Sequence, residues 1–158
     1  MSAYRLLTLE ELKEMEKEFV QYLVVNGIPA EDWEKMKQEE PSKAEKLIEV
    51  FSDMVFETIM RKVQFLEYRD KKELITFQCL EDEIVMVGMK AEGDSNVDFT
   101  SQEFVQKAMV SPPDGLKVYT SEKKYQKKRE VELFEMTQNG CFISEGNLFK
   151  ALCLALER

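Results

Sequence analysis

The stretch Val63–Met89, VQFLEYRDKKELITFQCLEDEIVMVGM, decides the fold of this chain. It contains three runs rich in β-branched and aromatic residues, which start at Val63, Leu74 and Ile84. Such runs are typical of β-strands, and the connections between them are short and charged, as surface turns are. The stretch therefore predicts an antiparallel meander. The run Ile84–Val87 lacks clean alternation, which predicts a strand covered on both faces and lying inside the sheet.

The residues before the meander predict helices. Thr8 and Glu11 form a capping box, and apolar residues then recur every three or four positions as far as Asn26-Gly27. This pattern predicts one amphipathic helix with a glycine stop. A second, short helix begins at Pro29, and Pro41 ends it.

A third helix is predicted to begin at Pro41 or Ser42, because one continuous apolar stripe follows and reaches Ile59. Residues 1–60 hold 14 Asp or Glu and seven Lys or Arg, a net charge of −7, whereas residues 61–158 hold 17 and 15. The three helices are therefore expected to pack together as an acidic module.

The residues after the meander mix helix and strand signals. Thr100 and Glu103 form a second capping box, residues 111–115 are the clearest breaker, and Leu116–Thr120 predicts a short edge strand. The segment 121–138 suits either a helix that ends at Asn139-Gly140 or a hairpin, and its strong helix formers favour the helix.

A last helix, capped by Ser144 or Asn147, carries a wide apolar face. Together these elements predict an α+β fold with N-terminal helices, a central antiparallel sheet of three to four strands, and C-terminal helices that cover it. A chain of 158 residues is long enough to bury a core without a disulfide or metal, so we expect residues 1–158 to form a single domain.

The composition excludes several classes of chemistry. The chain has no His, which removes imidazole bases, histidine zinc sites and the Ser-His-Asp and Cys-His mechanisms. Cys79, Cys141 and Cys153 are odd in number and far apart, which fits reduced thiols and not a disulfide framework. Cys141, after Asn139-Gly140, is the thiol to probe for reactivity. We expect no cofactor.

The charge and hydropathy favour a cytoplasmic protein. No window approaches the roughly 20 apolar residues of a membrane helix, and the N-terminus, Met1–Leu7, has no apolar stretch long enough for a signal sequence. The net charge of −9 opposes non-specific binding to nucleic acid or anionic lipid. We therefore expect no membrane partner.

The single basic cluster is the candidate binding site. Its residues are Lys123, Lys124, Tyr125, Lys127, Lys128 and Arg129. An aromatic among basic residues is a composition that binds single-stranded nucleic acid. Glu122 and Glu130 flank the cluster, however, and favour a solvated helix face, so nucleic acid is an unlikely partner. The cluster could instead dock on the acidic helices of a second copy, which would give a homo-oligomer.

Three other features have simpler structural interpretations. Residues 94–98 resemble the opening of a calcium loop, but Phe99 replaces the required Gly and Val105 the bidentate Glu, so we predict no metal site. Glu10, Glu14 and Glu18 are spaced as a soluble helix face. Trp33 is expected in the core, or at an interface as an anchor.

Several segments resemble a family of small, acidic, uncharacterised bacterial proteins, found mainly in Bacteroidetes. These segments are LLTLEELK at 6–13, FVQYL at 19–23, DWEK at 32–35, FSDMVFE at 51–57 and LFKALCLAL at 148–156. The likeness runs along nearly the whole chain. The resemblance implies one compact cytoplasmic domain, but it implies no activity, ligand or site residue.

The sequence favours a non-enzymatic protein-interaction or regulatory module. It contains no recognisable set of catalytic residues, and its acidic and basic residues are concentrated in different parts of the chain. One alternative is an enzyme or small-ligand binder that uses carboxylates with Tyr68, Tyr119 or Tyr125 in a pocket over the sheet. A further alternative is an RNA-binding accessory protein that uses residues 123–129.

Overall fold

A computed structural model describes residues 3–92, 97–110 and 115–156 of the chain. The chain divides into two compact units, Met1–Arg61 and Lys62–Arg158. The predicted calcium loop falls largely on residues 93–96, and most of the predicted breaker falls on residues 111–114. Both therefore lie outside the described residues.

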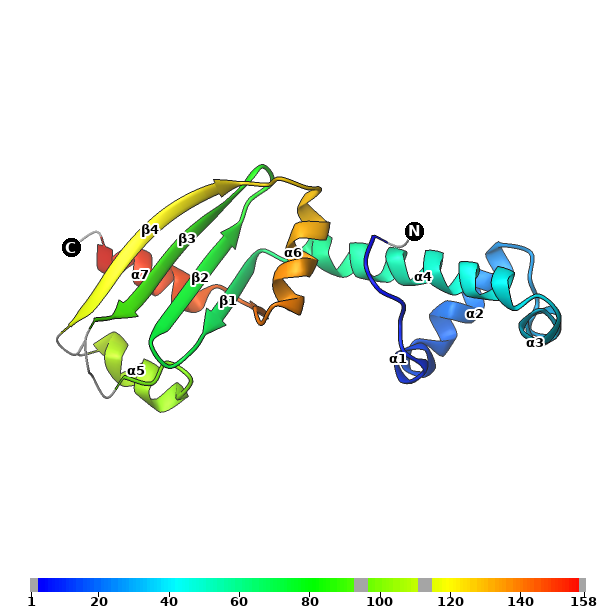
Figure 1. Cartoon of the computed structure of the whole chain (residues 1–158), viewed down its shortest axis with the longest axis horizontal. Helices are drawn as coiled ribbons and strands as arrows, with labels where there is room; N and C mark the ends of the chain where they lie inside the picture. The colour runs from blue at the N-terminus through cyan, green and yellow to red at the C-terminus, as the bar shows by residue number, and fades with distance from the viewer. Residues whose placement is uncertain (1–2, 93–96, 111–114, 157–158) are drawn as a thin grey trace. The chain divides into compact units, whose positions relative to one another are not determined.

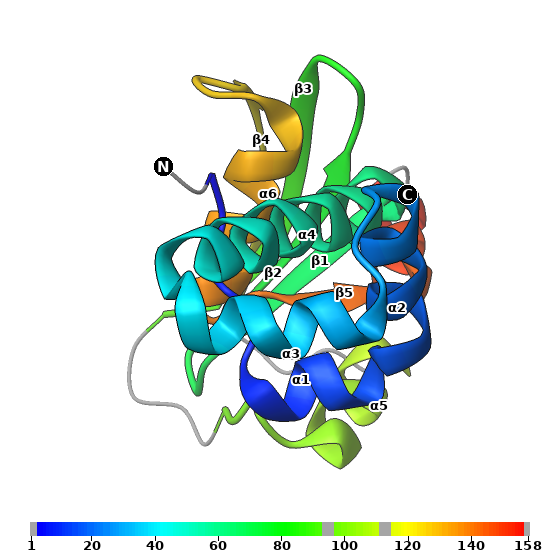
Figure 2. The same ribbon diagram turned by 90° about the vertical axis from the view of Figure 1, so that its right-hand side faces the viewer.

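The N-terminal unit consists of helices (Figures 1 and 2). Their bounds are α1 Leu9–Glu14, α2 Glu16–Val25, α3 Ala30–Glu39 and α4 Pro41–Lys62. The predicted capping box is present, since Thr8 Oγ1 accepts from the Glu11 N–H while the Glu11 carboxylate accepts from the Thr8 N–H. The helix predicted from Thr8 to Asn26 is wrong in one respect. At Met15 the backbone leaves helical geometry (φ −109°, ψ 24°), so two helices replace one.

In its described residues, the C-terminal unit is a five-stranded antiparallel sheet with three helices (Figure 1). The strands are β1 Phe65–Arg69, β2 Glu73–Cys79, β3 Glu83–Ala91, β4 Leu116–Lys124 and β5 Phe142–Ser144, in the order β4-β3-β2-β1-β5. The helices are α5 Gln102–Val110, α6 Arg129–Gln138 and α7 Asn147–Leu156. The α+β class is confirmed, and β3 lies inside the sheet as predicted. The count of three to four strands is wrong, because the three-residue β5 carries too little pattern to be recognised.

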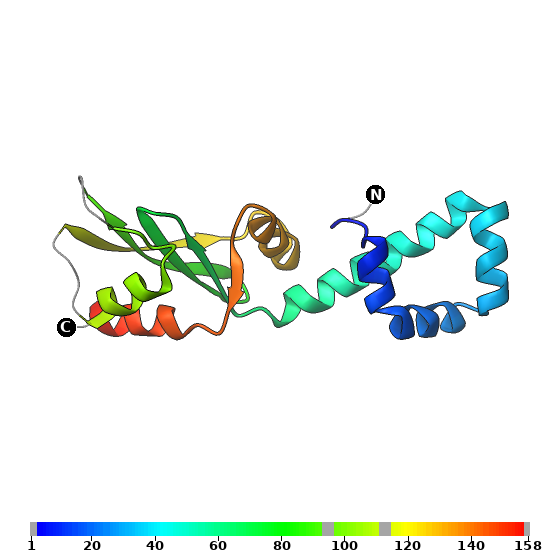
Figure 3. The same ribbon diagram turned by 90° about the horizontal axis from the view of Figure 1, so that it is seen from below.

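The two faces of the sheet are covered differently (Figure 3). One face packs against α5 and α7, and the main apolar core lies there, with Phe65 and Leu74 of the sheet against Val105 of α5 and Phe149 of α7. The helix α6 lies on the opposite face, where Glu132 binds Lys123 of β4 at 3.0 Å. Residues alternate between these faces along each strand, so a side chain's position in the register decides which helices it meets.

The helix predicted over 121–138 is wrong in its first part. β4 pairs with β3 over its whole length, as far as Lys124 opposite Glu83, and α6 begins only at Arg129. The hairpin alternative for this segment is wrong as well, because β4 pairs with β3 and residues 129–138 are helical. Lys and Glu residues have low strand propensity but are common on exposed edge strands, and pairing with β3 overrides the local preference.

Two predicted helix caps are each shifted along the chain. At α5, Ser101 Oγ, and not Thr100, accepts from the Phe104 N–H at 3.2 Å, while the Thr100 hydroxyl bonds Asp98. At α7, Lys150 N–H donates to the Gly146 carbonyl at 3.0 Å, so this glycine takes the cap position instead of Ser144 or Asn147.

Gly146 is required for packing at this point. Its φ is +86°, and a Cβ placed on it would lie 2.4 Å from the Phe65 ring. Without a side chain, the Gly146 backbone can lie against the Phe65 ring, where the chain turns from β5 into α7.

Candidate functional sites

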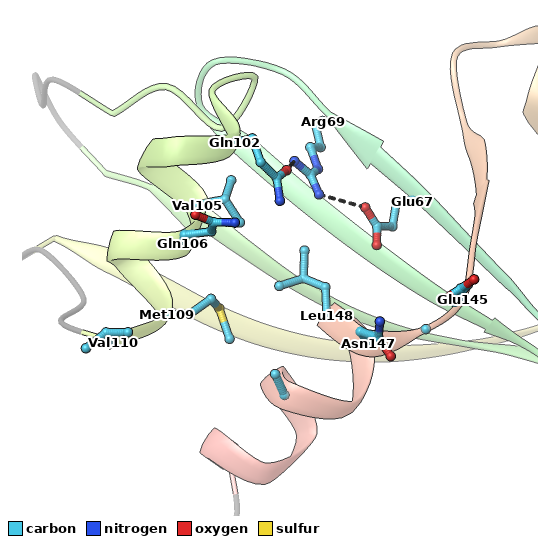
Figure 4. A pocket seen from close by; sticks show the side chains of 12 residues that line it. Glu67, Arg69, Gln102, Val105, Gln106, Met109, Val110, Glu145, Asn147 and Leu148 are labelled. Carbon is cyan, nitrogen blue, oxygen red and sulfur yellow. Dashed lines mark hydrogen bonds and ion pairs between the residues drawn. The ribbon is translucent and has the colours of Figure 1, made fainter.

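A cavity of about 640 Å³ lies in the C-terminal unit, between β1, α5 and the start of α7 (Figure 4). We call it the β1 cavity. It is lined by Glu67, Arg69, Gln102, Val105, Gln106, Met109, Val110, Glu145, Gly146, Asn147, Leu148 and Ala151. Its volume falls within the range of small-molecule sites, roughly 300–1,000 Å³.

A buried ion pair forms the polar end of the β1 cavity. Glu67 and Arg69 are two residues apart on β1, so both face the side of the sheet that α5 and α7 cover. Arg69 Nη2 donates to Glu67 Oε2 at 3.0 Å, and the Glu67 side chain is only 7% exposed. Pairing with the guanidinium partly offsets the cost of burying this carboxylate in a mostly apolar layer.

The guanidinium is held on its other side by α5. Arg69 Nη1 donates to Gln102 Oε1 at 2.9 Å, and Arg69 Nε is buried without a partner among the described residues. The amides of Gln106 and Asn147 also line the cavity. These groups can bind a ligand through hydrogen bonds. None of the described residues lining the cavity is a Ser, Thr, Cys, Lys or Tyr that could act as a nucleophile.

The phenols that the sequence proposed for a pocket do not line the β1 cavity. Tyr68 and Tyr119 alternate with its strand residues and lie on the opposite face of the sheet. Tyr119 donates to Glu73 Oε2 at 2.7 Å, and burial together with this carboxylate raises the pKa of Tyr119. Its ring fills the space at Gly88, where a Cβ would lie 2.5 Å from it. Tyr119 thus bridges β4 to β2, whereas Tyr68 donates to Asp70 in the turn after its own strand at 3.3 Å.

Two side chains of the basic cluster, Tyr125 and Arg129, form hydrogen bonds within the fold. Arg129 donates to the carbonyl oxygens of Val63, Cys79 and Leu80, which lie before β1 and at the end of β2. Tyr125 donates to the Leu80 carbonyl at 2.8 Å, and burial raises the pKa of its phenol to about 12. These two side chains hold the segment between β4 and α6 against the sheet.

The lysines of the cluster do not form one patch of free cations. Lys123 Nζ lies 3.0 Å from Glu132, and Lys127 Nζ contacts Glu135 at 2.5 Å. The pKa of Glu132 is lowered, because the hydrogen bonds and the charge of Lys123 outweigh the effect of burial. Lys124 and Lys128 are exposed. The binding site predicted at residues 123–129 stays a prediction.

The N-terminal unit contains an apolar groove of about 590 Å³. We call it the helical groove. It is lined by Leu9, Leu12, Lys13, Glu16, Phe19, Val20, Leu23, Ile28, Ala30, Trp33, Glu34, Lys37 and Ile48. Leu9 and Val20 are 80% and 42% exposed at its rim.

An aromatic cluster forms the floor of the helical groove. The Phe19 ring centroid lies 5.2 Å from that of Trp33 in an edge-to-face arrangement and 5.0 Å from that of Phe51. Trp33 is 9% exposed, as expected of a core residue. Lys37 Nζ lies 5.9 Å from the Trp33 ring and 3.0 Å from Glu34 Oε1, so part of the rim charge is already paired.

Cys79 and Cys141 form no disulfide, and their surroundings differ. Cys79 is buried, and burial raises its pKa to about 12, while Cys141 is partly buried, which also raises its pKa. A raised pKa lowers the fraction of reactive thiolate. We therefore expect Cys141 to be less reactive than its position after Asn139-Gly140 suggested.

Over residues 3–92, 97–110 and 115–156, no group of three or more acidic or Cys side chains is placed to hold a metal ion. Within the same ranges, no helix has both the length and the apolar composition to cross a bilayer.

Sequence reasoning missed both the β1 cavity and the helical groove. The available signal for the β1 cavity was a charged pair, Glu67 and Arg69, spaced so that both share a face of their strand with the apolar Phe65. The helical groove gave no signal in the sequence, because its apolar residues have the spacing of an ordinary core-facing helix side.

No curated protein and no solved structure is detectably similar to this chain. A family model does match it, over residues 1–157. The chain therefore belongs to a family of unknown function, DUF6495.

Proposed function

We propose that this protein is a non-enzymatic protein-interaction module, and that its helical groove binds an amphipathic helix of a partner protein. The observation that carries the proposal is the aromatic floor of the groove, with Phe19 and Trp33 beneath the exposed side chains of Leu9 and Val20. Buried aromatic anchors surrounded by apolar contacts are typical of protein interfaces.

The apolar surface extends beyond the groove, which favours a helix over a compact ligand. Val24 is 59% exposed and follows Val20 by one turn of α2, so both side chains lie on the same side of that helix. A partner helix covers such a strip with side chains at positions i, i+3, i+4 and i+7.

The charge of the unit favours a basic polar face on that partner helix. Residues 1–61 hold 14 acidic and eight basic residues, a net charge of −6. Long-range attraction by this acidic unit would speed the encounter with a cationic helix and slow that with an anionic one.

The single Trp of the chain lies in the groove and gives a direct test. The probe is a Leu/Lys amphipathic peptide of about 18 residues, or five helical turns, titrated while Trp33 fluorescence is followed. We expect a saturable change in emission. A peptide of the same composition in scrambled order, and a Leu/Glu peptide, should bind at least about tenfold more weakly.

Two matched variants locate the binding. Val20→Glu places a charge in the groove and should weaken binding at least about tenfold, because burying one Val contributes about 1.5–3 kcal/mol. Val25→Glu makes the same change on the same helix at an 86% exposed residue that does not line the groove, and it should bind as the parent does. Equal binding by the scrambled peptide, or by Val20→Glu, would refute the proposal.

The remaining features support narrower expectations. We propose a cytoplasmic bacterial protein, supported by the resemblance of its segments and by Cys79 and Cys141, which form no disulfide. Nucleic acid remains an unlikely partner. What supports this is the pairing of Lys123 and Lys127 with glutamates and the inward hydrogen bonds of Arg129.

A further inference from the structure

The β1 cavity holds a carboxylate oxygen that no described residue binds. Glu67 is 5% exposed, and its only partner in the described chain is Arg69, at Oε2. Figure 4 shows the second oxygen turned away from Arg69 and toward the part of the cavity where Asn147 lies. A carboxylate can accept hydrogen bonds at both oxygens, so Oε1 is an open acceptor inside a cavity.

The charge of the neighbouring guanidinium is already paired within the protein. Two of its nitrogens are bound, Nη2 to Glu67 and Nη1 to Gln102 at 2.9 Å. The third, Arg69 Nε, exposes less than 1 Å² and cannot be reached from the cavity. Nη1 and Nη2 each keep a second N–H, but the guanidinium charge is already paired with Glu67, so a carboxylate or phosphate would meet little net positive charge here.

The charge of the lining also favours a cation. Its charged residues are the carboxylates of Glu67 and Glu145 and the guanidinium of Arg69, so the described lining carries a net charge of −1. A hydrogen bond between an ammonium and a carboxylate is charge-assisted, and it is stronger away from bulk water.

The rest of the cavity is suited to an alkyl chain. Val105 and Met109 of α5 face Leu148 and Ala151 of α7, next to the polar end formed by β1. In Figure 4, Val105, Met109 and Leu148 project into the space between the two helices. A ligand that fits must combine a hydrogen-bond donor of positive charge with a short aliphatic part.

We propose that the β1 cavity binds a small aliphatic primary amine, whose ammonium donates to Oε1 of Glu67 and whose alkyl chain packs against Val105, Met109 and Leu148. The amine is either a free alkylamine or the amino group of an apolar amino acid, since both present this chemistry. This site is separate from the helical groove and does not depend on the function proposed for it.

The test uses three probes that share one branched alkyl chain: isopentylamine, L-leucine and 4-methylpentanoate. Each is titrated into the full ¹⁵N-labelled chain at pH 7, and the backbone amide shifts are followed by NMR. We expect isopentylamine, leucine or both to move amides of β1, α5 and the start of α7 saturably, with a Kd on the order of 1 mM, as small ligands allow. The carboxylate probe should move none of them.

Glu67→Gln keeps the shape of the side chain and removes its charge, so amine binding should weaken at least about tenfold. Glu132→Gln is the matched control. Glu132 is equally buried, at 7% exposure, and is paired with Lys123, but it lies on the other face of the sheet. Amine binding by this variant should match that of the parent chain.

Ala151→Leu is a second variant, which leaves the ion pair intact and fills the apolar part of the cavity. It should weaken amine binding even if Glu67→Gln does not fold. The proposal is overturned if neither amine probe saturates by about 20 mM, if 4-methylpentanoate binds as well as the amines, or if a folded Glu67→Gln or Ala151→Leu chain binds with unchanged affinity. Saturation by isopentylamine alone would identify free amines as the ligand class, and saturation by leucine would identify amino acids.

Discussion

Arg129 supports the strongest stability prediction, because one side chain joins three backbone carbonyls. The acceptors belong to Val63, Cys79 and Leu80, and the Arg129 side chain is 15% exposed. We predict that Arg129→Met, which keeps most of the aliphatic packing, removes all three hydrogen bonds.

The magnitude follows from burial at the acceptors. Val63 and Cys79 are 4% and 5% exposed, so water cannot replace the guanidinium there, whereas Leu80 is 39% exposed and its carbonyl can be rehydrated. A hydrogen bond to a charged group contributes about 1.5–3 kcal/mol. Two such bonds at the lower end give a loss of about 3 kcal/mol in the free energy of unfolding.

The assay is urea unfolding followed by far-UV circular dichroism, with Trp33 fluorescence reporting the N-terminal unit separately. Lys124→Met is the matched control, since it removes an exposed cation of the same cluster and should change stability by less than about 0.5 kcal/mol. Arg129→Lys should recover only part of the loss, because an ammonium is compact and cannot span three carbonyls. If Arg129→Met and Lys124→Met unfold at the same urea concentration, the structural role assigned to Arg129 is refuted.

Three further predictions concern single sites. Gly146→Ala should lower stability by about 2–4 kcal/mol in urea, because its Cβ would meet the Phe65 ring at a φ of +86°, and a loss under about 1 kcal/mol would contradict that contact. Glu11→Gln should cost about 1 kcal/mol near pH 7. The hydrogen bonds from Arg5 and Thr8 lower the pKa of Glu11 to about 2, so its stabilisation is present above the unfolded-state pKa of about 4.5 and is lost as the pH falls toward 2. The urea midpoints of parent and variant should therefore converge over that range, and a difference that persists at pH 2 would count against the ion pair. Finally, Cys79 should resist iodoacetamide at pH 8 in the folded chain and react once unfolded, as read by mass spectrometry, because burial raises its pKa to about 12; rapid native labelling would show that it is accessible.

Most of the regular structure could be predicted from the sequence because its signals are local. The capping box at Thr8, the apolar stripe of α4 and the turns of the meander each depend on residues a few positions apart, and all are present in the structure. The break at Met15 escaped prediction, since the apolar spacing continues across it. β5 escaped as well, because three residues carry no recognisable period.

The candidate sites depended on contacts between distant segments. Arg129 appeared to belong to a basic cluster, but its hydrogen bonds are to carbonyls near Val63 and Cys79, 66 and 50 positions away. The β1 cavity likewise combines Glu67 of a strand with Gln102 and Asn147 at the starts of two helices. No local pattern in the sequence links these positions.

The sequence by itself determined the fold class, the acidic N-terminal helices and the absence of imidazole chemistry, because propensity, periodicity and composition are properties of neighbouring residues and of the chain as a whole. Only the tertiary structure decided that Ser121–Lys124 is strand, that Arg129 points inward and that Glu67 has an open oxygen. Each of these depends on strand pairing or on packing across the sheet, where contacts made in the folded state outweigh the local preference of the residue.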